Sequence, residues 1–452
     1  MQAKISVVIP ACEAEKHLGH CLRALHESLL PAFEIIVVDD ASRDATGKIA
    51  ADFGVKVLHT DQRMGPAFAR NLGAKAAAGD VLFFVDSDVC VRPDTLKKIG
   101  KRFDEDAALD AIIGSYDENP AEQDFISQYR NLMHAYIHQT GAERASTFWS
   151  GCGAIRREIF LEHSGFSEEY GRPSIEDIEL GYRLTRDHRK IVLDRSIQVT
   201  HLKKWTFWNL VKTDIMDRGI PWTELILRDR TMPNDLNLQI SQRVSVALVF
   251  VLVALSGALA VVSGAYLLVP LLAILFLMLA RWWGELGSYR RPHRALFILS
   301  CAVGLIAAVA YSYRMFGLIP PLTVVPVLLA LRHRYNKQGT LKKSHRWLGI
   351  VYICCSLCIA LYYLPAHKLI FACFAVLLLL ALLNSQFYIF LAGKRGIAFM
   401  LAAIPFHLLY HFYNGLSFVV GISRHFYAAA VRGGPPGAAE PPPGRKQYPL
   451  SR

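Results

Sequence analysis

Three short apolar runs without alternation stand near the start of the chain, at 5–9, 34–38 and 81–85. An unbroken apolar run predicts a strand covered on both faces, the kind found inside a parallel sheet. Between the first two runs, Leu18, Leu22, Leu25 and Leu29 recur at helical spacing. A second helix is predicted over 66–78, with proline at its start and Gly79 as its stop. The order strand, helix, strand predicts a βαβ unit and an α/β domain.

Acidic side chains follow two of these strands at the point where each strand ends. Asp39 and Asp40 follow the second run, and Asp86 and Asp88 follow the third. In open α/β sheets the ligand crevice lies beyond the carboxyl ends of the strands, so we expect these acids at one edge. Carboxylates as close as Asp86 and Asp88 repel each other unless a cation lies between them, and oxygen ligands suit Mg²⁺ or Mn²⁺. Asp-Ser-Asp also forms turns, so the pair alone does not establish a metal site.

The hydrophobic pattern changes after residue 243. The region 244–283 is long enough for a membrane hairpin, and further apolar segments lie at 295–313, 316–331, 347–364, 368–391 and 397–421. We therefore predict about five to seven membrane spans. The basic connectors at 290–294, 332–346 and 393–396 are expected to face the cytoplasm. An odd number of spans would place the C-terminus outside, so a surface or re-entrant helix is the alternative for 397–421.

The composition agrees with a membrane protein. Of the 452 residues, 53% are hydrophobic, the mean hydropathy is +0.27 and the net charge is +12. This is too apolar for an entirely soluble chain. The positive charge indicates a membrane surface as partner, and nothing resembles a nucleic-acid-binding module, so no nucleic-acid partner is expected. The nine cysteines form no convincing zinc pattern, and reduced thiols are the simple account.

Three regions are predicted: a cytosolic catalytic domain over 1–230, a transmembrane helical domain over 231–421, and a Pro/Gly-rich basic tail over 422–452. No signal peptide precedes the first strand, so the catalytic domain is expected to stay in the cytosol. Within it, 203–230 combines tryptophans with many basic residues, as amphipathic helices at a membrane surface do. A buried helix pair between the domains is the alternative. Either arrangement brings the active site close to the bilayer.

Seven motifs follow one another in the first half of the chain: ISVVIPACEAEKHL, EIIVVDDASRDAT, GPAFARNLGA, VDSD, SGCGAIRREIF, GFSEEY and EDIELGYRL. In number and order they resemble those of the family-2 inverting glycosyltransferases of GT-A fold, roughly over 4–230. The resemblance implies an α/β GT-A catalytic domain, Rossmann-like with a mostly parallel sheet, followed here by an all-α transmembrane domain. The family usually opens with Pro-Thr-Tyr-Asn-Glu, whereas this chain has Pro-Ala-Cys-Glu-Ala at 10–14, without the stacking tyrosine.

The resemblance also implies roles for individual residues. The donor-binding residues would be Pro10, Ala11, Glu13, Asp39, Asp40, Arg70 and Asp86. A Mg²⁺ or Mn²⁺ ion on the donor diphosphate would be held by Asp88, Asp86 and His201. Asp177 would be the base that takes the proton of the acceptor hydroxyl. The sugar and acceptor pocket would include Trp149, Gly151, Cys152, Gly153 and Glu176.

Several of these residues also have a structural interpretation. The stretch 39–42 is a good turn sequence, and Arg70 can be a solvated helix charge. A lone histidine such as His201 is more often structural than metal-binding. Ser174 could cap the helix that follows it, where acids favour the N-terminus, and Trp149 could belong to the core. The sequence leaves these alternatives open.

Three functions are compatible with this organisation. The first is transfer of one sugar from a nucleotide-sugar, with UDP favoured, to a membrane lipid or lipid-linked glycan, by an integral protein of the bacterial inner membrane. The second is a processive polysaccharide synthase, whose Gln-x-x-Arg-Trp signature is missing here. The third is a transporter with an inactive sugar-nucleotide domain, against which no acid lies inside the predicted spans. A dinucleotide-dependent oxidoreductase is weaker still, because no Gly-x-Gly-x-x-Gly follows the first strand.

Overall fold

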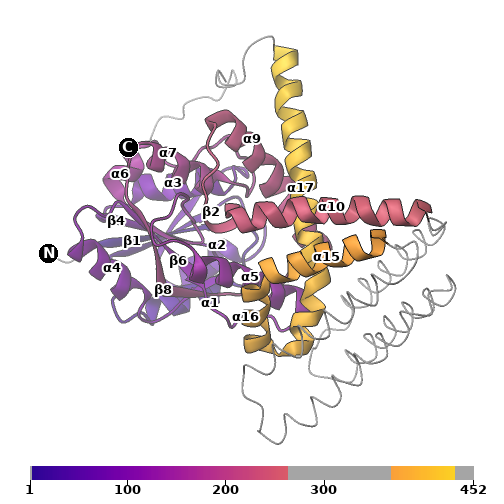
Figure 1. Cartoon of the computed structure of the whole chain (residues 1–452). Helices are drawn as coiled ribbons and strands as arrows, with labels where there is room; N and C mark the ends of the chain where they lie inside the picture. Colours follow the sequence, from indigo (N-terminus) through magenta and orange to yellow (C-terminus); the bar gives the residue numbers. More distant parts are fainter. Residues whose placement is uncertain (1–2, 263–367, 433–452) are drawn as a thin grey trace, which may run out of the picture.

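The computed structural model describes residues 3–262 and 368–432 (Figure 1). Its strands are β1 (Ile5–Ala11), β2 (Glu34–Asp39), β3 (Lys56–His59), β4 (Val81–Val85), β5 (Val89–Val91), β6 (Ala111–Tyr116), β7 (Cys152–Arg156) and β8 (Ile191–His201). The helices among and directly after them are α1 (Leu18–His26), α2 (Thr46–Asp52), α3 (Pro66–Ala76), α4 (Thr95–Glu105), α5 (Phe125–Thr140), α6 (Arg157–Glu162), α7 (Glu176–Arg186), α8 (Phe207–Lys212), the π-helical η1 (Thr213–Gly219), α9 (Ile220–Asp229) and the 3-10 turn η2 (Leu236–Leu238). The apolar helices are α10 (Ile240–Val262), α15 (Lys368–Leu383), α16 (Ser385–Arg395) and α17 (Ile397–Arg432).

The strands form one mixed sheet in the order β3-β2-β1-β4-β7-β6-β8-β5. β1 pairs in parallel with β2 and β4, β2 with β3, and β6 with β8. β7 runs antiparallel between β4 and β6, and β5 is antiparallel to β8. Most pairings are therefore parallel, and helices follow the sheet domain. The predicted fold class, a mostly parallel α/β domain followed by an all-α region, is confirmed.

Each face of the sheet has its own hydrophobic core, which explains the unbroken apolar runs. In β4, Phe83 enters one core with Leu18 and Leu22 of α1. Its neighbour Phe84 enters the other core, where its ring lies 5.1 Å from the ring of Phe160. Because successive strand residues point to opposite faces, a strand between two cores must be apolar at every position.

The strand predictions at 5–9, 34–38 and 81–85 are confirmed by β1, β2 and β4. The predicted helices are present but shorter, as α1 and α3. The prediction missed α2 and β3, which lie between β2 and α3. α2 has only seven residues and β3 only four, so neither shows enough periodicity to be recognised. Their presence adds a parallel strand at the edge of the sheet.

The helices α10, α15, α16 and α17 lie on one side of the α/β domain (Figure 1). By length and composition, Ile240–Leu259 and Ile397–Ala428 could each cross a membrane. A third candidate is the pair α15 and α16, bent by 65° at Asn384. The predicted spans at 295–313, 316–331 and 347–364, and most of the hairpin at 244–283, lie outside the described residues. The prediction of five to seven spans is therefore tested only at its two ends.

The basic, tryptophan-rich segment 203–230 forms α8, η1 and α9. Its tryptophans have different surroundings: Trp205 is buried in a cluster with residues of α5 and α17, whereas Trp208 is 66% exposed. The side chain of Trp222 donates a hydrogen bond to the hydroxyl of Tyr182 in α7, at 3.0 Å. The segment thus packs between the α/β domain and α17 and still presents one tryptophan to the outside. It combines features of both arrangements that the sequence left open.

Candidate active site

Asp40 organises the turn that starts α3. Its carboxylate accepts hydrogen bonds from the Thr60 hydroxyl and from the backbone N–H groups of Met64 and Gly65, each at 2.8 Å. Gly65 has a φ of +91°, and a Cβ there would lie 2.7 Å from the carbonyl oxygen of Gly171. A glycine is needed in this position for both reasons. The predicted donor residue Asp40 therefore has a positioning role in this structure, because it sets the start of the helix that carries Arg70.

Arg70 joins the end of β4 to the start of α7. One end of its buried guanidinium lies 2.7 Å from the carboxylate of Asp86, and the other lies 2.9 Å from that of Glu176. Burial raises the pKa of Glu176, although the charge of Arg70 acts in the opposite direction. The Arg70 Nε is also buried and has no hydrogen-bond partner among the described residues. Arg70, Asp86 and Glu176, which were predicted for the donor and the sugar pocket, thus lie together. Arg70 and Glu176 are 106 positions apart in the sequence.

Asp88 has a different partner from Asp86. Its carboxylate lies 3.7 Å from Nε2 of His201, the last residue of β8, because β5 pairs with β8 and Val89 stands opposite His201. The His201 ring stacks on Tyr116 at 4.5 Å. Burial opposes ionisation of Asp88, but the nearby His201 imidazole outweighs this effect and lowers the pKa of Asp88. The predicted metal ligands Asp88 and His201 therefore lie together.

The side chains around Asp88 and His201 suit a divalent cation only in part. A carboxylate and an imidazole are suitable ligands, but Asp86 is engaged by Arg70. In residues 3–262 and 368–432, no group of three or more His, Cys, Asp or Glu side chains is arranged to hold a metal. The residues therefore fit an ion that takes its remaining ligands from a bound diphosphate, and the metal site stays a prediction.

Asp177 stands in the first turn of α7 and is held by the segment before β7. Its Oδ2 accepts hydrogen bonds from the backbone N–H and the hydroxyl of Ser150, both at 3.0 Å. The neighbouring acids are occupied differently, since Glu176 pairs with Arg70 and Glu179 pairs with Arg183. Ile175, not Ser174, is the N-cap of α7, and the Ser174 hydroxyl donates to the Asp217 carbonyl at 2.7 Å. Among these acids, Asp177 is the one without a basic partner in the described structure.

The residues predicted for the nucleotide lie at the ends of β1 and β2. Pro10 and Ala11 pair with Val38 and Asp39 in the sheet. The Asp39 carboxylate accepts the backbone N–H of Ser42 at 3.1 Å and lies 3.3 Å from Nδ1 of His59. Glu13, with a φ of +50°, forms an ion pair with Arg63. These side chains form a group of their own, at the same sheet edge as Asp86.

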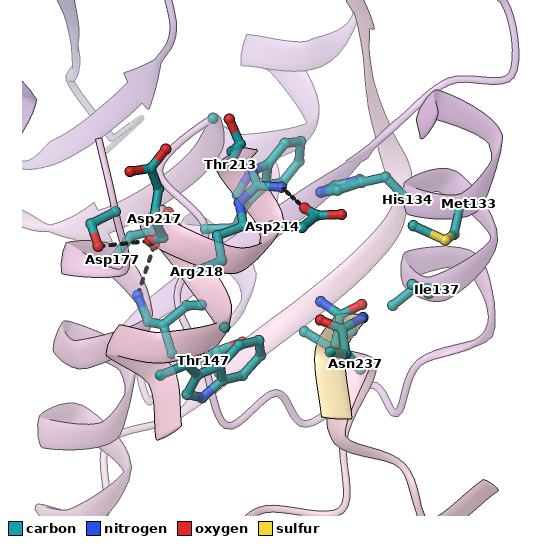
Figure 2. Close-up of a pocket in the computed structure, with 18 of the residues that line it drawn as sticks. Met133, His134, Ile137, Thr147, Asp177, Thr213, Asp214, Asp217, Arg218 and Asn237 are labelled. Carbon is teal, nitrogen blue, oxygen red and sulfur yellow. Dashed lines mark hydrogen bonds and ion pairs between the residues drawn. The ribbon is translucent and has the colours of Figure 1, made fainter. Parts of the chain in front are cut away.

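A cavity of about 690 Å³ lies between the end of the sheet and the helices that follow it. Its wall on the side of the sheet includes Arg70, Asp86, Asp88, Glu176, Asp177 and His201. The opposite wall comes from α5 (Met133, His134, Ile137), η1 (Thr213, Asp214, Asp217, Arg218), α10 (Val246) and α17 (Tyr410, Asn414, Phe418). Figure 2 shows the labelled side chains of η1 and α5 facing the same space as Asp177. The cavity thus joins the acids of the sheet to the apolar helices.

The predicted sugar pocket is only partly assembled here. Trp149 and Gly151 line the cavity. Cys152 and Gly153 lie in β7 and are not among its lining residues: Cys152 is 1% exposed, and a Cβ on Gly153 would meet the Phe148 ring at 2.6 Å. Trp149 also packs against both cores of the α/β domain, so it has the core contacts that the sequence left open as well as a face on the cavity.

Two features of the cavity were not predicted. A buried cluster joins Arg130 of α5 to Asp214 of η1 at 2.9 Å, and the Tyr413 hydroxyl of α17 donates to the same carboxylate at 2.7 Å. The second feature is a pair of stacked histidines on α5, His134 and His138, with ring centres 4.2 Å apart. Burial lowers the pKa of His138 to about 4. The partners of the first feature come from elements distant in the chain, so the sequence offered no signal for it, and the burial of the two histidines depends on the packing around α5.

The sequence of the α/β domain is similar to those of known glycosyltransferases. Residues 6–163 match the model of glycosyl transferase family 2. The chain is 35% identical over 121 residues to the glycosyltransferase GlyG of Streptococcus pneumoniae, covering 26% of this chain and 40% of GlyG. It is 36% identical over 135 residues to the 4,4'-diaponeurosporenoate glycosyltransferase of Staphylococcus haemolyticus, covering 28% of this chain and 30% of that protein. The chain thus spans less than half the length of these two relatives.

Solved structures include similar chains at lower identity. The crystal structure of S. aureus TarS 1-349 is 22% identical, with a TM-score of 0.37, and the match covers 50% of this chain and 65% of that one. The family match, which includes β1 to β7, is the stronger finding. Residues 6–163 of the α/β domain therefore match glycosyl transferase family 2.

Proposed function

We propose that the chain is a membrane-bound inverting glycosyltransferase. It transfers a sugar from a nucleotide-sugar, with UDP favoured, to a lipid or lipid-linked glycan at the cytosolic face of a bacterial inner membrane. The observation that carries this proposal is the cavity, since one space is lined both by Asp88 and Asp177 and by Val246 and Phe418 of the apolar helices. An acceptor that is anchored in the bilayer could reach the acids of the sheet through that space.

The reaction uses Asp177 as the general base. The acceptor O–H gives its proton to the Asp177 carboxylate while the acceptor oxygen forms a bond to the anomeric carbon. The bond from that carbon to the diphosphate oxygen breaks on the opposite face, and its electron pair leaves with the nucleoside diphosphate. Ser150 supports this role because its two hydrogen bonds to Oδ2 fix the direction of the carboxylate.

Asp88 and His201 would hold a Mg²⁺ or Mn²⁺ ion, which would neutralise charge on the leaving diphosphate. Arg70 keeps Asp86 and Glu176 in place through its two ion pairs, and its charge lies at the same wall of the cavity. The donor nucleotide is assigned to the ends of β1 and β2, where Ala11 and Asp39 are sheet neighbours. The proposed metal site thus concerns the diphosphate of the donor, and the ends of β1 and β2 concern its nucleotide.

The test uses the purified full chain in lipid nanodiscs, incubated with a panel of nucleotide-sugars and total bacterial lipids. We expect one nucleotide-sugar to be consumed and a lipid product heavier by one sugar to be found by mass spectrometry. Asp177→Asn serves as the inactive control. A product carrying a long sugar chain would favour the processive synthase. Donor binding without any turnover, under conditions where lipid and metal are supplied, would favour the inactive domain of a transporter.

A further inference from the structure

Helix α17 has two faces of different character. Along one face the residues are buried: Phe399, Ala403, Phe406, Tyr413, Ser417 and Gly421. The opposite face carries an apolar stripe, here called the outer stripe, formed by Leu401, Leu408, Phe412, Leu416, Val419 and Phe426. Spacings of three, four and seven residues keep each set on one side of a helix. In the outer stripe, Leu416 is 43% exposed, Val419 53% and Phe426 61%.

The buried face contacts the glycosyltransferase side of the molecule along most of the helix. Near its start, the ring of Phe399 lies 4.9 Å from that of Phe125 in α5. In the middle, Tyr413 donates a hydrogen bond to Asp214 of η1. Towards the end, Arg424 forms an ion pair with Glu224 of α9 at 3.1 Å. At 1.5 Å per residue, these contacts extend over about 37 Å.

Small residues let this face pack closely against η1 and α9. A Cβ on Gly219 of η1 would lie 2.6 Å from the Cβ of Ser417. Further along, a Cβ on Gly421 would lie 2.6 Å from the Cβ of Thr223 in α9. The helices therefore approach each other closely at two successive points, where a glycine of one helix faces a side-chain Cβ atom of the other. α17 is therefore packed tightly against η1 and α9, the helices that follow the sheet.

If α17 crossed the membrane, the helices packed against it would also enter the hydrocarbon layer. α5, η1 and α9 carry many charged side chains, among them Arg130, Asp214, Glu224 and Arg228. Charged side chains at the centre of a membrane helix are energetically costly. With 36 residues, α17 is also longer than the roughly 20 residues that cross a bilayer. Its length and composition qualify it as a span, but its contacts do not.

α10 and α15 indicate where the membrane lies. Near the sheet domain, the Asn384 side chain that follows α15 donates to the Ser245 hydroxyl of α10 at 2.9 Å. Farther out, the Ser256 hydroxyl lies 4.0 Å from the Cys373 sulfur, so the two helices are antiparallel. α17 meets α10 close to the Ser245 end, where Phe412 stacks on Phe250 at 5.5 Å. Figure 1 shows α17 running across the direction of α10 and α15.

We propose that α17 lies along the membrane surface and does not cross it. Its outer stripe enters the boundary between headgroups and acyl chains, and its buried face seats the glycosyltransferase domain on the bilayer. The stripe is continuous with the apolar surface of α10, since Leu408 and Phe412 pack in the cluster that includes Val249. Residue 432 then stays on the same side as the active site. This inference rests on the membrane location proposed above.

The first experiment measures depth in the bilayer. Spin labels are placed on the full chain in nanodiscs through Leu401→Cys, Leu416→Cys or Phe426→Cys, and the signal of the unmodified chain is subtracted to account for native cysteines. Oxygen and a water-soluble nickel chelate report the depth of each label. Val244→Cys and Val251→Cys on α10 are the matched control, because a crossing helix should show increasing depth along these exposed positions. Nucleotide-sugar hydrolysis verifies that each variant is folded.

We expect the three α17 labels at one shallow depth, and the two α10 labels at depths that differ by about 10 Å. A crossing helix would instead place the labels at 401 and 426 in opposite leaflets, about 37 Å apart, and would overturn the proposal. Labels in water at all three positions would also overturn it, because the outer stripe would then not contact lipid.

A second experiment compares reporters fused before residue 1 and after residue 452. We expect both on the cytosolic side, and reporters on opposite sides would contradict a surface location. The outcomes separate the two proposals. Shallow, equal depths without any sugar transfer to lipid would refute the proposed acceptor and leave the α17 inference intact. Transfer to lipid with labels in opposite leaflets would do the reverse.

Discussion

Replacing Asp177 by asparagine tests the general base directly. Oδ2 accepts two hydrogen bonds from Ser150, and Oδ1 lies 2.8 Å from the backbone N–H of Ile178. An amide can still offer its oxygen to Ser150, but its NH₂ group then faces the N–H of Ile178. One hydrogen bond to a charged acceptor is lost, which costs about 1.5–3 kcal/mol of stability. The loss of the base is expected to lower kcat by about 10²–10⁴, with donor affinity nearly unchanged.

Two variants serve as matched controls. Glu179→Gln stands on the same helix, but Glu179 is not among the residues that line the cavity and holds Arg183 and Arg228 instead. It should cost stability of about 1–3 kcal/mol and leave kcat close to that of the parent. Ser150→Ala removes one of the two hydrogen bonds to Oδ2 and should lower kcat less than Asp177→Asn. This order follows if Ser150 only positions the carboxylate.

The assay measures turnover in detergent, donor binding by calorimetry and thermal unfolding for each variant. Turnover of Asp177→Asn within about threefold of the parent would refute its role as base, because a lost base costs at least tenfold more than that. Equal loss of donor binding in Asp177→Asn and Glu179→Gln would show a general disturbance of α7 instead. A fall in kcat with unchanged binding, confined to Asp177→Asn, is the expected result.

Three further predictions concern the surrounding residues. Arg70→Met should cost about 3–5 kcal/mol because it leaves Glu176 buried without its partner, and adding Glu176→Gln should restore part of the lost melting temperature; additive losses would contradict this. Asp88→Asn should abolish turnover, as should complete chelation of divalent ions in the parent; turnover that survives chelation would exclude the metal role. The pKa of His138 is lowered to about 4, below that of the unfolded chain, so stability should fall as pH drops from about 6.5, by about 2 kcal/mol at pH 5. Melting temperatures at pH 7 and pH 5 check this, and an unchanged pH slope in His138→Gln would contradict it.

The positions of the acids near the sheet could be predicted because strand ends are local features. A buried parallel strand must be apolar throughout, and the first polar residue after it marks the edge of the sheet. This reasoning located Asp39, Asp40, Asp86 and Asp88 correctly. It could not assign their partners, since Asp40 binds the turn before α3 while Asp86 binds Arg70. Partners are chosen by packing between elements, which local pattern does not contain.

The packing of α17 could not be read from hydropathy for a related reason. In α17, the residues that contact the domain are aromatic or small, such as Phe406 and Ser417, so they do not lower mean hydropathy as charged residues would. The segment therefore passes as a membrane span by composition. Only the contacts with α5, η1 and α9 distinguish a helix that packs along a domain from one that crosses lipid. The surface or re-entrant helix that the sequence left open for 397–421 is the arrangement these contacts favour.

The sequence by itself determined the class of the fold, the family motifs, the two-part organisation and the sheet edge where the acids stand. These depend on period, on order along the chain and on chemistry that is local to each segment. The tertiary structure alone decided that Asp88 faces His201 while Asp86 faces Arg70, that Ser150 holds Asp177, and that α17 lines the cavity. Such contacts join residues far apart in the chain, and they follow from how the helices pack on the sheet and on one another.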